Sequence, residues 1–250
     1  MDPDLITIII MSVIPPIGFT YFVYKRDTWK PDSPALVLIG FLFGILSAVM
    51  AYFLELYGTL PLGNYLLASS TNPWYVIVYT AFIVAGFSEE FCKLLIFGIL
   101  IWYRKKFDEI YDGMMYMIAI SMGFAAIENI RYGVLYLGPT IGLAIRGITS
   151  VPAHSIFSGV MGYWVGKGKT TPGKAGRYVI TGLFAGIILH GIYDTPAISI
   201  STNFIIWFLV TYGLTGWIIA LCAIAVFLIV GYIGLRRLLN KAKEEDASRQ

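Results

Sequence analysis

The chain has 250 residues, of which 58% are hydrophobic and 13% charged, with a formal net charge of +3. Apolar stretches of about 20 residues mark a polytopic helical membrane protein and argue against one or two soluble domains. The basic residues are spread over loops, which argues against nucleic-acid binding, and the two cysteines, Cys92 and Cys222, form no disulfide framework or paired metal motif.

Seven apolar segments follow in chain order, and each predicts a transmembrane helix, because backbone groups in hydrocarbon must pair within their own segment. They are 5–24, 34–57, 73–103, 113–136, 140–165, 178–199 and 204–235. The last segment is too long for one span, so we expect a break near Gly213 or Gly216, with 201–212 interfacial or re-entrant. The sequence therefore predicts an all-α fold of about seven transmembrane helices. Residues 1–240 form a single membrane-embedded domain in this interpretation, and 241–250 form a short charged cytoplasmic tail.

The basic residues predict how the chain is oriented. Fifteen of the 18 lysines and arginines fall in the first, third and fifth loops and in the C-terminal tail. None falls in the N-terminal segment or in the other loops. Because basic residues concentrate on the cytoplasmic side, this pattern predicts a multi-pass cell-membrane protein with its N-terminus outside and its C-terminus cytoplasmic.

Polar residues remain inside the predicted spans, where a charge costs roughly 3 kcal/mol and therefore usually has a function. Glu89, Glu128, His154 and His190 lie on four different spans. Counted from the start of each span at the rise of an α-helix, all four fall near the middle of the bilayer. Glu55 falls at the outer end of its span, so we expect it to be interfacial.

Spacing along the helices pairs several of these groups. Glu89 and Glu90 reach Lys93 at i+4 and i+3, and His190 precedes Asp194 by four residues. Residues at these spacings share a helix face, so each set can act on one ligand.

Four motifs carry a resemblance to a known family: SEEFCK (88–93), GFAAIENIRYG (123–133), RGITSVPAHSIFSG (146–159) and HGIYD (190–194). With these motifs the sequence resembles the PrsW family of intramembrane proteases, which is distantly similar to the CAAX prenyl endoprotease superfamily. The resemblance implies a peptidase centre with supporting roles for Lys93, Asn129 and Arg146. Its catalytic residues would be Glu89, Glu90, Glu128, His154, His190 and Asp194.

Two ways of activating water stay open at this point. Glu89 can act as general base while the histidines hold the water or donate to the oxyanion. Alternatively, Glu128, His154 and His190 match the ligand count of a catalytic zinc ion, with Glu89 or Glu90 left over as base. No cofactor is certain from the sequence, and zinc is the candidate.

The sequence thus predicts an intramembrane endopeptidase that hydrolyses membrane-associated proteins in a polar cavity between spans three to six. Its partners would be a membrane-anchored protein or peptide substrate and the lipid bilayer, with no nucleic acid. The alternative is a proton- or ion-coupled transporter, since Glu, His and Asp near the midplane also serve as relays. A non-enzymatic scaffold that binds a partner helix is a third interpretation.

Overall fold

The computed structural model describes residues 2–26, 33–68, 70–200 and 205–249, and all regular structure in these ranges is helical. The α-helices are α1 (Pro3–Arg26), α2 (Pro34–Leu54), α3 (Leu60–Leu66), α4 (Pro73–Tyr79), α5 (Ser88–Leu100), α6 (Ile110–Tyr132), α7 (Ile141–Thr170), α8 (Ala175–Ser199) and α9 (Ile205–Ala247). Three π-helical segments extend or join them: η1 (Glu55–Thr59), η2 (Thr80–Phe87) and η3 (Gly133–Leu137). The result is seven helical stretches that match the seven apolar segments, which confirms the all-α prediction.

Five helical stretches are long and apolar enough to cross a membrane: Pro3–Arg26, Pro34–Leu66, Ile110–Tyr136, Ala175–Ser199 and Ile206–Ala247. The other two, 73–100 and 141–170, hold a concentration of buried polar residues, including Glu89, Glu90, Lys93 and His154. The chain is therefore a helical membrane protein in which the less apolar helices lie among more apolar ones.

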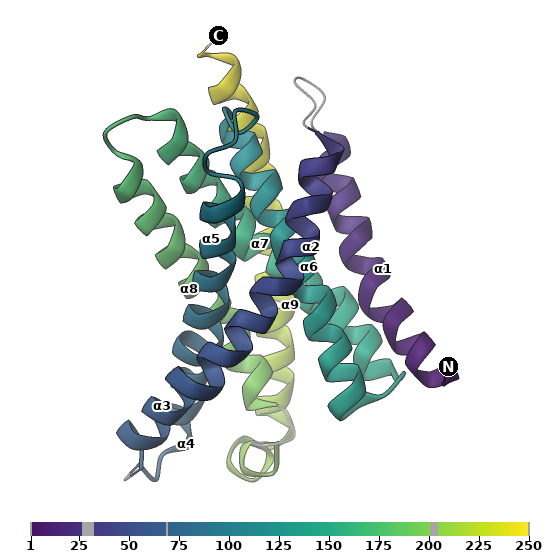
Figure 1. Cartoon of the computed structure of the whole chain (residues 1–250). Helices are drawn as coiled ribbons and strands as arrows, with labels where there is room; N and C mark the ends of the chain where they lie inside the picture. Colours follow the sequence, from purple (N-terminus) through teal and green to yellow (C-terminus); the bar gives the residue numbers. More distant parts are fainter. Residues whose placement is uncertain (1, 27–32, 69, 201–204, 250) are drawn as a thin grey trace.

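Successive long stretches run in alternating directions through the bundle (Figure 1). The N-terminus lies at the lower end of this view and the C-terminus at the upper end (Figure 1). The end of α1, the α5–α6 and α7–α8 connections and the end of α9 all lie at the upper end (Figure 1). These are the regions that carry the basic residues, so the described part of the fold gathers them at one end, as the charge pattern requires.

Helix α6 is the central element, and it packs against α1, α2 and α7. Glycines let its backbone approach two of these neighbours. A Cβ atom at Gly123 would collide with the backbone carbonyl of Phe41 in α2, and one at Gly113 would lie 2.6 Å from the carbonyl oxygen of Gly162 in α7. Small residues at such crossings allow close helix packing in membranes. The polar residues that follow on α6 are thereby held beside α7.

The predicted break in the last apolar segment occurs at Gly213. Its backbone has φ 62° and ψ −164°, a conformation that in practice only glycine adopts. The preceding residues 205–212 form a short helix that is seen end-on at the bottom of Figure 1, across the direction of the long helices. Residues 201–204, the start of the predicted interfacial or re-entrant segment, lie outside the described residues.

The C-terminal end of α9 forms hydrogen bonds with the start of α6 and with α7. Both carboxylate oxygens of Asp246 accept hydrogen bonds from the first backbone N–H groups of α6, from Ile110 at 2.9 Å and from Tyr111 at 3.0 Å. The hydroxyl of Tyr163 on α7 donates to Glu245 at 2.7 Å. Residues 241–247, at the start of the predicted tail, thus continue α9 and cap α6 at its N-terminus.

We expect Asp246→Ala to lower the free energy of unfolding by about 1–3 kcal/mol, because two buried backbone donors would lose their acceptor. Thermal unfolding of the purified chain in detergent measures the change. The matched control is Glu244→Ala, because Glu244 is an exposed acid two residues away on the same helix. Equal melting temperatures for the two variants would contradict the capping role of Asp246.

Candidate active site

The polar residues singled out in the sequence come together from four helices. Glu89 and Glu90 lie in the first turn of α5, which follows directly on the π-helical segment η2. This segment packs against α8 with close contacts: a Cβ at Gly191 would collide with the ring of Phe82. Because η2 lies tightly on α8, the start of α5 is brought against His190.

Glu90 is held from three sides and is fully buried. Its Oε1 atom accepts a hydrogen bond from Nζ of Lys93 at 2.7 Å and lies 3.0 Å from Nδ1 of His190. Its Oε2 atom accepts from the hydroxyl of Ser158 on α7 at 3.3 Å. A carboxylate paired with an ammonium only accepts, so Nδ1 of His190 is the donor in this contact. Glu90 therefore joins α5, α7 and α8.

Glu89 makes longer contacts than its neighbour. Its Oε2 atom lies 3.4 Å from Nζ of Lys93 and 3.9 Å from Nε2 of His190. The same Nε2 atom lies 3.4 Å from Oδ2 of Asp194. One ring nitrogen thus faces two carboxylates, an arrangement that calls for a proton on the ring or on one of the acids.

His154 uses both of its ring nitrogens. Its Nδ1 atom lies 3.2 Å from Nζ of Lys93, and its Nε2 atom lies 3.0 Å from Oε2 of Glu128. Lysine can only donate, so Nδ1 is the acceptor and Nε2 carries the proton that is donated to Glu128. The imidazole therefore bridges the ammonium of α5 and the carboxylate of α6.

Arg146 contacts three polar residues at one side of the cluster. Its guanidinium lies 3.0 Å from Oε2 of Glu128 and donates to Oδ1 of Asn129 at 3.0 Å and to the hydroxyl of Ser150 at 3.3 Å. The amide nitrogen of Asn129 has no hydrogen-bond partner among the described residues, although the residue is buried. A buried donor without a partner requires an explanation, and a bound substrate supplies one.

Exposure divides the cluster into an inner and an outer part. The side chains of Glu90 and Lys93 are fully buried, and that of Glu89 is 7% exposed. Those of Glu128, Arg146 and Asp194 are 16%, 21% and 20% exposed, respectively. Glu128, Arg146 and Asp194 therefore form the partly exposed edge of the cluster.

Several contributors to the cluster were not singled out in the sequence. Ser158 lies four residues after His154, a helical spacing that would have placed it on the same face. The ring of Phe157 stacks on His190 with centroids 4.6 Å apart. Glu55 is the first residue of η1 and is partly buried, and its predicted interfacial position stays a prediction.

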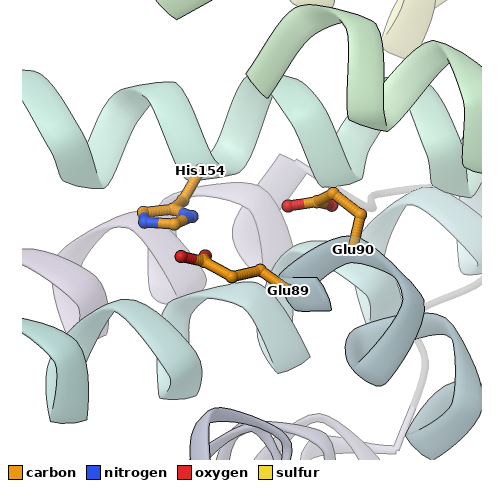
Figure 2. Close-up of side chains that lie close together, drawn as sticks. All are labelled: Glu89, Glu90 and His154. Carbon is orange, nitrogen blue, oxygen red and sulfur yellow. The ribbon is translucent and has the colours of Figure 1, made fainter. Parts of the chain in front are cut away.

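The residues that could hold a metal differ from the predicted set. In the part of the chain that the structure describes, Glu89, Glu90 and His154 form the one group of three or more such donors, with one ligand atom from each within 4.8 Å of the others. Figure 2 shows the Glu89 carboxylate beneath the His154 ring of α7 and the Glu90 carboxylate to one side of it, both carried by α5. The predicted set of Glu128, His154 and His190 differs from this group and stays a prediction: Glu128 lies against Nε2 of His154, and the Nδ1 atom of His190 is turned toward Glu90.

Comparisons with known proteins assign the chain to a family. Residues 32–230 match the model of the PrsW family of intramembrane metalloproteases. Proteases named PrsW are similar to the chain: that of Geobacillus kaustophilus is 31% identical over 75% of this chain and 78% of its own length. The protein of Oceanobacillus iheyensis is 29% identical over 87% and 94%, and that of Bacillus subtilis is 28% identical over 92% and 93%. No solved structure gave a significant match. The chain therefore belongs to the PrsW family of intramembrane metalloproteases and is a membrane-embedded hydrolase.

Proposed function

We propose that the chain is an endopeptidase that hydrolyses membrane-associated proteins with water activated by Glu89, in a polar site between the four helices α5, α6, α7 and α8. The observation that carries this proposal is the connected network of acids and imidazoles that reaches this site from all four helices. Burying such groups together costs free energy, so their presence in one site indicates a function.

The two neighbouring glutamates have different roles in this proposal. Glu90 has three polar partners within 3.3 Å, so its lone pairs are occupied and it serves as an anchor. The contacts of Glu89 are 3.4 and 3.9 Å long, which leaves its carboxylate free to accept a proton from water. A general base must reach the proton that it takes, and Glu89 meets this condition better than Glu90.

The reaction balances with this chain's own residues. As Glu89 takes the proton, the water oxygen forms a bond with the carbonyl carbon of the substrate, and the carbonyl oxygen becomes an oxyanion. The free amide N–H of Asn129 and the partly exposed Arg146 are donors for this oxyanion. In this proposal the proton shared by the Glu89, His190 and Asp194 group starts on the His190–Asp194 pair. It passes to the leaving nitrogen as the carbon–nitrogen bond breaks, and the proton that Glu89 took from water then returns to His190, whose Nε2 atom lies 3.9 Å from Glu89.

Substrate and water would enter from the end of the bundle that holds the N-terminus. Arg146 lies near the start of α7, and Glu128 and Asp194 lie near the ends of α6 and α8. All three helix ends lie at the lower end of Figure 1, opposite the basic regions. With the basic end cytoplasmic, this entrance faces outside, and the N-terminus is outside as well. The partner would be a membrane-anchored protein or peptide.

We expect Glu89→Gln to abolish cleavage of a co-expressed single-span membrane substrate, with a loss of about 100-fold or more, because the amide cannot accept the proton from water. Immunoblots of substrate fragments, normalised to the amount of enzyme in the membrane, measure the loss. The variant should reach wild-type abundance, since Glu89 has only long contacts to lose.

Glu90→Gln is the contrasting variant. It removes the charged partner of a fully buried ammonium. We expect it to lower the free energy of unfolding by about 3–5 kcal/mol and to reduce activity as well. If Glu89→Gln instead kept full cleavage while a pH-dependent uptake was lost, the transporter interpretation would replace the peptidase.

Asn129→Ala should lower kcat about 100-fold with little change in KM, because the amide N–H would stabilise the oxyanion rather than the bound substrate. Ser150→Ala is the matched control, since Ser150 also contacts Arg146 but contributes no free donor. Steady-state cleavage of a detergent-solubilised substrate separates the two parameters. Equal, small effects of both variants would assign Asn129 to helix contact alone.

A further inference from the structure

The three possible metal ligands converge on a cation that the chain itself supplies. Nζ of Lys93 lies 3.4 Å from Glu89, 2.7 Å from Glu90 and 3.2 Å from Nδ1 of His154. These are the same three residues that form the candidate metal group. An ammonium has three N–H donors, and three acceptors surround this one. The ring of Phe124, whose centroid lies 4.1 Å from Nζ, covers another side.

We propose that the ammonium of Lys93 takes the place of a metal ion in this chain, so that it hydrolyses peptide bonds without a divalent cation. The inference rests on the proposed peptidase function and concerns how that site is charged. It departs from the metalloprotease description that the family carries.

The geometry makes the ammonium and a metal mutually exclusive. A metal bound by carboxylate and imidazole lies about 2.0–2.2 Å from each ligand atom. An ion at that distance from all three donors would lie in direct contact with Nζ, which already hydrogen-bonds to each of them. Two positive charges cannot share this buried space, because Lys93 is fully buried and, among the described residues, forms its ion pairs with Glu89 and Glu90.

Both ring nitrogens of His154 are already hydrogen-bonded. Metal binding uses a ring lone pair, and the lone pair of His154 at Nδ1 is already the acceptor for Lys93. The other ring nitrogen donates to Glu128, which Arg146 holds in turn. A metal at this site would therefore have to displace the lysine, while water activation by Glu89 needs no such change.

Metal analysis of the purified full-length chain, with Co²⁺ alone as the added probe, tests the proposal. The wild type should retain cleavage in the presence of a chelator and bind no Co²⁺. Lys93→Met, which keeps the length of the side chain without its charge, should gain a site for about one Co²⁺ per chain, visible in its absorption spectrum. Lys93→Arg keeps the charge and should gain none, and adding His154→Ala to Lys93→Met should remove the new site.

Two outcomes would overturn the proposal. The first is a wild-type chain that holds one equivalent of zinc and whose cleavage is lost to a chelator and restored by zinc. The second is a folded Lys93→Met variant that binds no Co²⁺. If Lys93→Met does not fold, the wild-type metal content and chelator response decide alone. None of these results would contradict the proposed peptidase function, which fails only if Glu89→Gln leaves cleavage intact.

Discussion

The buried ion pair between Lys93 and Glu90 is the contact on which the polar interior of this protein depends. Its atoms lie 2.7 Å apart with both side chains fully buried, where an unpaired charge would be costly. The pair is satisfied only because α7 supplies His154 and Ser158 and α8 supplies His190. Three helices must therefore keep their register for these charges to stay paired.

The same pair explains why two adjacent glutamates are not equivalent. Lys93 lies closer to Glu90 than to Glu89, and His190 does so as well. Glu90 is thereby fixed, and Glu89 is left with weaker contacts toward the edge of the site. A hydrolase needs both properties, a rigid frame and one carboxylate that can exchange a proton.

The apolar part of the fold serves this arrangement. Close glycine crossings hold α6 against α2 and α7, and Asp246 at the end of α9 fixes the start of α6. Together they set the position of Glu128 opposite His154. Exposure then increases from the buried Glu89 and Glu90 to Glu128 and Arg146 at the edge of the cluster.

The sequence by itself determined the helical class, the seven apolar stretches and a break near Gly213 or Gly216, which the structure places at Gly213. These follow from local rules: hydrophobic length, the conformational freedom of glycine and the rise per residue of a helix. It also placed Lys93 within reach of both glutamates. Only the tertiary structure decided which glutamate the lysine holds, because i+3 and i+4 neighbours are nearly equivalent until α7 and α8 add their side chains. The same limit explains why the predicted metal set differs from the group of Glu89, Glu90 and His154 that the structure brings together, since the rotation of each helix about its axis is fixed by packing and not by position along the chain.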